Sequence, residues 1–192
     1  MDPSRPDRLP PLEHETMSDE QRAAVREMVA GPRKEVLGPF VPLLRSPELM
    51  TRLQRVGAYL RYESCLPDAV FELVVLVVAR HWDQQFEWGH HQPLAIRAGV
   101  PEEVVVDVAA WRRPVTDRRD LLVGHDVASA LLHHGAVDDD SYSRAVDELG
   151  EQAFVELVAA VGYYTTLALT MNAARTPSPY AIRLEPPSRA AT

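Results

Sequence analysis

The chain has 192 residues with 28 acidic and 20 basic side chains, so its formal net charge at neutral pH is −8. This length suits a single domain with a buried core. The acidic charge argues against nucleic acids and anionic membranes as partners. The one cysteine, Cys65, excludes an intrachain disulfide and any metal site built from cysteines alone.

The prolines are unevenly distributed. Of the 16 prolines, eight lie before residue 48 and four lie after residue 176, which leaves four for the long middle of the chain. Because proline interrupts helices, we expect an extended arm at 1–16, a helical domain at 17–175 and a second arm at 176–192. Arms this rich in proline are often ordered only across a neighbouring subunit.

The N-terminus has no apolar leader, and the longest uncharged apolar run, 157–174, carries threonines and an asparagine. It is shorter than the roughly 20 residues that a bilayer requires. We therefore predict a buried core helix here, no contact with a membrane, and a cytoplasmic protein.

Helix signals follow one another through the middle of the chain. Ser18 and Gln21 have the spacing of a capping box, and Ser46 precedes a proline at the first helical position, Pro47. We expect helices at residues 18–30, 46–63, 67–81, 82–98, 101–113, 117–135, 138–150 and 151–174.

Valine runs and internal prolines complicate this pattern. The valine-rich runs 74–78 and 104–106 have strand propensity, but both are joined to helix caps and lack hairpin turns between them. Pro93 should kink or divide its helix, and the proline-rich segment 31–46 should form a loop. We predict an all-α fold.

Glu72 is the one charged residue between Ala69 and Ala79, and its helical neighbours are apolar. Desolvation should raise the pKa of this carboxyl and favour a role in holding a proton. The alternative is a buried glutamate tied to an arginine or to a backbone amide.

Three polar residues of the next segment, Gln84, Glu87 and His91, fall within an arc of roughly 60° on a helix. Glu87 and His91 lie one turn apart, so a hydrogen bond between them could fix the imidazole tautomer and raise its basicity. This arrangement suits general acid–base chemistry. The alternative is an exposed ion pair on a solvated helix.

The spacing of Glu72, Gln84, Glu87 and His91 resembles the signature of the carboxymuconolactone decarboxylase / AhpD-like alkylhydroperoxidase superfamily. The string Glu-Trp-Gly-His-His at 87–91 supports the resemblance, as do Leu-Arg-Tyr at 60–62, Ala-Arg-His-Trp at 79–82 and Gly-Tyr-Tyr at 162–164. The resemblance implies an AhpD-like helical bundle over about residues 35–175. It also implies self-association, as a trimer or hexamer and possibly as a dimer.

The peroxidase branch of that superfamily carries cysteines where this chain has Gln84 and Glu87. Neither side chain can attack a peroxide or resolve a sulfenic acid. Cys65 has no thiol partner and is expected to be a small packing residue at a helix end. Peroxidase activity is therefore disfavoured.

The decarboxylase branch implies lyase chemistry without a cofactor on a small organic acid, lactone or carbonyl compound. His91, oriented by Glu87, would deliver a proton that Glu72 holds or relays. Gln84, Trp88 and Arg80 would bind the substrate. A non-catalytic binding or scaffold protein with the same fold is the alternative.

We predict no metal site. Glu87 and His90 have the spacing of a di-iron ligand pair, but the second such pair that a ferritin-like site needs is absent from the sequence. A single-metal site formed by Glu72, Glu87 and His91 has suitable ligand types and stays open. The sequence also leaves open whether His90 or His91 faces the pocket.

Overall fold

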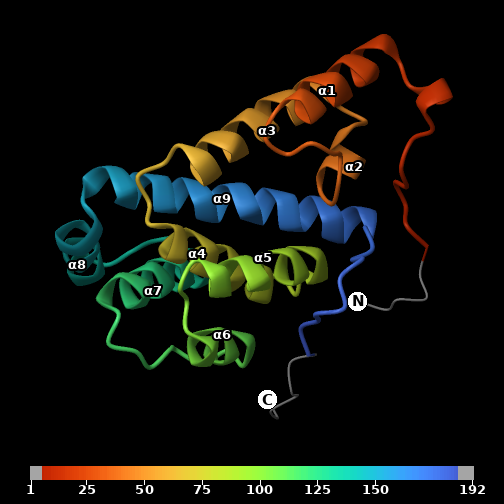
Figure 1. Cartoon of the computed structure of the whole chain (residues 1–192). Helices are drawn as coiled ribbons and strands as arrows, with labels where there is room; N and C mark the ends of the chain where they lie inside the picture. The colour runs from red at the N-terminus through yellow and green to blue at the C-terminus, as the bar shows by residue number, and fades with distance from the viewer. Residues whose placement is uncertain (1–5, 186–192) are drawn as a thin grey trace.

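A computed structural model describes residues 6–185, which form a bundle of helices (Figure 1). The helices are η1 (His14–Thr16), α1 (Asp19–Ala30), α2 (Phe40–Leu43), α3 (Pro47–Tyr62), α4 (Asp68–His81), α5 (Gln85–Arg97), α6 (Glu102–Ala109), α7 (Arg119–His134), α8 (Asp139–Leu149) and α9 (Glu151–Ala174). No strand occurs among these described residues. The all-α prediction is confirmed.

Helix α4 lies at the centre of the fold, in contact with α5, α6, α7 and α9. Every side chain from Ala69 to Arg80 is buried. A helix enclosed on all sides can be apolar all round, which explains how the valine run of this segment is accommodated without a strand. Each fully buried valine or leucine contributes about 1.5 to 3 kcal/mol.

Helix α9 runs across the molecule between the α1–α3 pair and the group formed by α4, α5 and α7 (Figure 1). Within the described chain it is the helix whose length and composition would suffice to cross a membrane. Half of its apolar window is buried inside the fold, and Leu157, Ala160 and Met171 are fully enclosed. It packs as a core helix.

Most predicted boundaries agree with the structure, and the capping box at Ser18 is present in both directions. Helix α5 begins at Gln85 rather than near Trp82, because Asp83 adopts a left-handed φ of 49° and Gln84 caps the helix from outside. Pro93 lies inside α5 without dividing it.

The segment predicted as a loop at 31–46 contains the one-turn helix α2, so that prediction was incomplete. Pro39 and Pro42 are compatible with so short a helix. Proline fixes a helical φ, and its missing amide costs little in a first turn, where amides lack intrahelical partners.

The described parts of both arms pack against their own chain. At the N-terminal side, the amide of Arg8 donates to the carbonyl of Ala174. The C-terminal arm returns along α5, where the side chain of Gln85 exchanges two hydrogen bonds with the backbone of Leu184. The arms therefore find partners within one subunit, and residues 1–5 and 186–192 of the predicted arms lie outside the described residues.

Candidate active site

A cavity of about 180 Å³ opens between the loop before α2, α3, α5 and α9. We call it the first cavity. Its walls include Arg33, Phe40, Arg61, Phe86, Glu87, His90, His91 and Tyr164. Gly38 shapes one wall: its φ is 54°, and a Cβ there would lie 2.3 Å from the Phe86 ring. Only glycine allows the loop to turn this closely against α5.

Three buried side chains form a chain of polar contacts beside the cavity. His91 Nδ1 lies 2.6 Å from Glu72 Oε2, and His91 Nε2 lies 3.3 Å from Glu87 Oε2. All three residues are less than 8% exposed. Glu72 is brought in by α4, and Glu87 and His91 come from successive turns of α5.

The imidazole of His91 is thus bracketed by two carboxylates. Burial opposes its protonation, but the hydrogen bonds and charges of Glu72 and Glu87 outweigh burial and raise the pKa of His91. An imidazolium between two carboxylates keeps a proton within reach of either one. The interpretation of Glu87 and His91 as an exposed ion pair is wrong, because both are buried.

Glu87 is the member of this trio that offers an unsatisfied atom. Its Oε1 is buried and has no hydrogen-bond partner among the described residues, and Glu87 lines the cavity, whereas Glu72 does not. Tyr164 packs edge-on to His91 at 5.2 Å and shields it from water. A buried acceptor without a partner is costly, so this atom is suited to a substrate group.

Two arginines supply positive charge to the same cavity. Arg33 lies over the Phe40 ring, and its Nε and Nη2 are buried without hydrogen-bond partners in residues 6–185. Arg61 comes from α3 and lies 3.4 Å from His90 Nε2. Neither guanidinium forms an ion pair with a described carboxylate. Both can therefore attract an anionic ligand.

His90 also lines the cavity, so both adjacent histidines face it. Burial, together with the positive charges of His91, Arg61 and Arg33, lowers the pKa of His90 to about 3. The neutral ring accepts from Arg61 at Nε2, which assigns its proton to Nδ1, where it donates to the Tyr180 hydroxyl at 2.7 Å.

The structure does not bring the three predicted substrate-binding residues to this cavity. Gln84 caps α5 by accepting from the Phe86 amide and donates to Asn172. Trp88 is 3% exposed and belongs to the hydrophobic core. Arg80 lines a different cavity at the C-terminal end of α4.

Four residues that lie at or beside the first cavity were not identified from the sequence: Arg33, Arg61, Tyr164 and Tyr180. Arg61 and Tyr164 lie in strings that carry the family resemblance, so a signal for them existed. Arg33 and Tyr180 lie in a loop and in an arm, where no periodicity marks them. Gly89 allows Tyr180 to reach the site, since a Cβ on that glycine would lie 2.6 Å from Tyr180 Cβ.

Cys65 lies outside the first cavity and is exposed, so its prediction as a packing residue is wrong. Its thiol donates to Glu156 Oε2 at 3.1 Å, and its amide donates to the same oxygen. The hydrogen bond to Glu156, together with partial desolvation and the negative charge of that carboxylate, raises the pKa of Cys65. This environment disfavours the thiolate that a peroxidase requires.

Residues 6–185 contain no group of three or more histidine, cysteine, aspartate or glutamate side chains arranged to hold a metal ion. In a comparison with known families, the model of the carboxymuconolactone decarboxylase family matches residues 47–117. This segment spans α3 to α6 and contains Glu72, Glu87 and His91. No curated protein matches the chain.

Proposed function

We propose that this chain is an enzyme that moves protons on a small carboxylic acid or lactone without a cofactor. The match of residues 47–117 to the carboxymuconolactone decarboxylase family supports this proposal. One observation carries it: Glu87, which lines the cavity, has a buried oxygen without a hydrogen-bond partner among the described residues, and His91 and Glu72 lie behind it. A general acid or base needs both a site open to the substrate and a route for its proton.

The arginines would hold the substrate. A carboxylate or lactone carbonyl would accept hydrogen bonds from the buried donors of Arg33 and from Arg61. The two cations, together with the proton on His91, would offset the repulsion between an anionic substrate and the two glutamates. A cavity of about 180 Å³ is smaller than drug-sized pockets, which favours a compact substrate.

The chemical step would use Glu87 as the catalytic acid. In a decarboxylation, the bond between the carboxyl carbon and the adjacent carbon breaks, carbon dioxide leaves, and the electron pair stays on carbon, delocalised into a conjugated carbonyl. The imidazolium of His91 passes its Nε2 proton to Glu87, Glu87 donates that proton to the carbon, and the neutral His91 then takes up a proton from water. Glu72 accepts from Nδ1 of His91 and keeps Nε2 directed at Glu87.

Hydrogen–deuterium exchange tests this proposal without knowledge of the physiological substrate. The full-length protein is incubated in D₂O with a panel of β-keto acids and carboxylated unsaturated lactones, and exchange and carbon dioxide release are followed by NMR. Glu87→Gln should lower the rate on any active compound by at least about 100-fold. Glu156→Gln, which removes a buried carboxylate that does not line the cavity, should leave the rate unchanged.

Equal rates in wild type and Glu87→Gln would remove Glu87 from the mechanism. Saturable binding of these acids with no exchange for any of them would instead favour a non-catalytic binding protein. Consumption of peroxide that is lost in Cys65→Ser would contradict the proposal and favour a thiol peroxidase.

Self-association is a further part of the proposal. Val155 and Val158 of α9, and Val56 and Tyr62 of α3, are apolar side chains with large exposed fractions on the single chain. Their exposure supports a homo-oligomer, the state that the family resemblance implies. Light scattering that gives the 21.5 kDa mass of one chain at micromolar concentration would contradict it.

A further inference from the structure

A second cavity, of about 240 Å³, lies between α4, α6 with the loop that follows it, and α7. Its polar walls come from Arg80, Arg112, Arg113, His125, Ser129 and His133, and its apolar walls include Val77, Val108 and Leu132. It shares no lining residue with the first cavity. No role in the proposed reaction requires it.

Arg80 is the central cation of this second cavity. It is 2% exposed, and its Nη1 donates to the backbone carbonyl of Glu185. Its Nε and Nη2 are buried and have no hydrogen-bond partner among residues 6–185. Asp83 Oδ1 lies 3.1 Å from Nη2, but that contact does not have the geometry of a hydrogen bond, and Asp83 is half exposed.

Nε and Nη2 together form the side-on edge of a guanidinium, which matches the two oxygens of a carboxylate. The same protein uses this edge elsewhere: Arg55 holds both oxygens of Glu27 through these two atoms, and Arg113 does the same with Asp126. In Arg80 the corresponding edge is buried at a cavity wall. Asp83 Oδ1 approaches Nη2, but no described carboxylate spans Nε and Nη2 or accepts a hydrogen bond from them.

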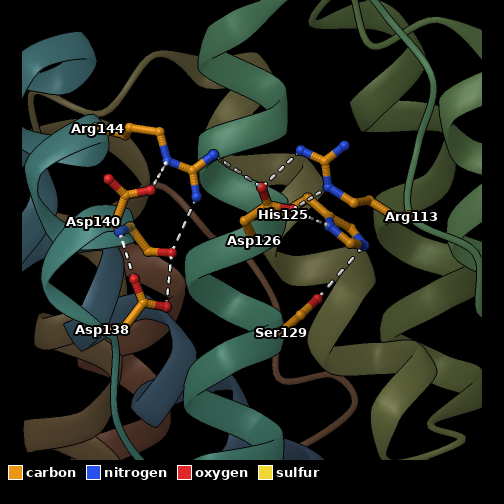
Figure 2. Close-up of polar contacts among 8 residues, drawn as sticks. Arg113, His125, Asp126, Ser129, Asp138, Asp140 and Arg144 are labelled. Carbon is orange, nitrogen blue, oxygen red and sulfur yellow. Dashed lines mark hydrogen bonds and ion pairs between the residues drawn. The ribbon is translucent and has the colours of Figure 1, made fainter.

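The surroundings keep this edge in place. The Trp111 ring lies over Arg80, with the guanidinium carbon 5.0 Å from the ring centroid, and Trp111 adopts a left-handed φ of 59°. That conformation is uncommon and costly for a bulky residue. Figure 2 shows Asp126 between Arg113 and Arg144, with His125 beside it, and Arg113 and His125 line the cavity. Asp126 thus occupies the Nε–Nη2 edge of Arg113, whereas Nε and Nη2 of Arg80 have no hydrogen-bond partner among the described residues.

We propose that the second cavity binds a small organic carboxylate, whose two oxygens accept hydrogen bonds from Nε and Nη2 of Arg80 and whose apolar body contacts Val77, Val108 and Leu132. The volume lies below the roughly 300 to 1,000 Å³ of drug-sized pockets, which limits the ligand to a fragment-sized acid. The apolar walls favour an organic acid over inorganic phosphate.

Benzoate is the probe, and NMR of the ¹⁵N-labelled full-length protein is the measurement. Trp111→Phe assigns the Trp111 indole resonance. Benzoate should shift that resonance saturably, whereas benzamide, which has the same shape without the charge, and inorganic phosphate should bind at least about tenfold more weakly. Benzamide or phosphate that binds as tightly as benzoate would overturn the carboxylate assignment.

Four variants locate the site. Arg80→Met should weaken the benzoate-dependent shift at least about tenfold, and the matched change Arg55→Met, on the surface, should not. Arg33→Met, in the first cavity, should also leave the shift intact, so this result is independent of the proposed function. If Arg80→Met does not fold, Ser129→Phe, which fills the cavity from α7, decides the question. Wild-type affinity in the folded variants at Arg80 or Ser129 would overturn the proposal.

Discussion

Two carboxylates beside the first cavity, Glu72 and Glu87, pair with a histidine, whereas those beside the second cavity pair chiefly with arginines. In the first, Glu72 and Glu87 bracket His91 and raise its pKa, and Arg33 and Arg61 have no described carboxylate partner. In the second, Asp107 and Asp126 hold Arg112 and Arg113. There His81 packs beside His133, and burial together with the His133 charge lowers the pKa of His81.

A carboxylate therefore supports different chemistry in the two cavities, depending on whether its partner is a histidine or an arginine. A carboxylate beside an imidazole stores a transferable proton, whereas a carboxylate beside a guanidinium forms a fixed pair, because arginine does not lose its proton in proteins. The first cavity is therefore suited to proton transfer and the second to static binding of an anion.

Removing a carboxylate partner of His91 should have the largest effect on the stability of the protein. Glu72→Gln should lower the pKa of His91, measurable by NMR titration, and destabilise the fold by about 3 kcal/mol, because it removes one partner of a buried ion pair. Asp126→Asn is the matched change in the second cavity. It should cost about 1 kcal/mol or less, since Arg113 and Arg144 are half exposed.

The pKa shift of His91 fixes how the stability lost in Glu72→Gln should change with pH. The folded-state pKa of His91 is raised above its ordinary value of 6.5, so its contribution to stability is fully present below pH 6.5 and is lost as pH rises through the raised value. The stability gap between wild type and Glu72→Gln should therefore shrink at alkaline pH. A gap that widens there would contradict the bracketed imidazolium.

The next effect tests the loop that forms the wall of the first cavity. Gly38→Ala should lower the free energy of unfolding by about 2 kcal/mol or more, because alanine at a φ of 54° is strained and its Cβ would meet the Phe86 ring. Gly162→Ala is the control: it lies in α9 with nothing within 4 Å of the added Cβ. It should stabilise the protein by about 0.5 to 1 kcal/mol. Chemical denaturation measures both.

A smaller effect distinguishes the two adjacent histidines. The pKa of His90 is lowered from 6.5 to about 3, so the unfolded chain binds a proton more readily than the folded chain between these values. His90 therefore costs stability as pH falls from 6.5 toward 3. In urea unfolding at pH 7, 5.5 and 4, His90→Gln should gain stability relative to wild type as pH decreases. The exposed His14→Gln is the matched control, and an equal gain there would contradict the assignment.

The smallest effect concerns the arm over the first cavity. Tyr180→Phe removes the hydroxyl that accepts from His90 and should cost about 1 kcal/mol, seen as a lower melting temperature. It should leave the benzoate-dependent shift of Trp111 unchanged. A loss of that shift would show that the arm couples the two cavities.

Much of the fold could be predicted because its signals are local. Helix caps at Ser18, left-handed glycines and the clustering of prolines at the ends mark where helices begin and stop. The errors lie where a tertiary contact decides the backbone. Gln84 leaves the helix to donate to Asn172 of α9, and the segment after Pro39 forms α2, which packs on α3 and α9.

The sequence by itself determined the all-α fold and placed Glu87 and His91 one turn apart on a helix, since helical spacing puts residues on one face whatever surrounds them. It marked Glu72 as the one charge in an apolar helical segment. Only the tertiary structure decided which partners those residues have. Arg33 reaches the first cavity from a loop, Tyr180 reaches His90 from an arm, and Arg80 lines the second cavity instead. Contacts between segments far apart in the chain depend on packing, which no local pattern encodes.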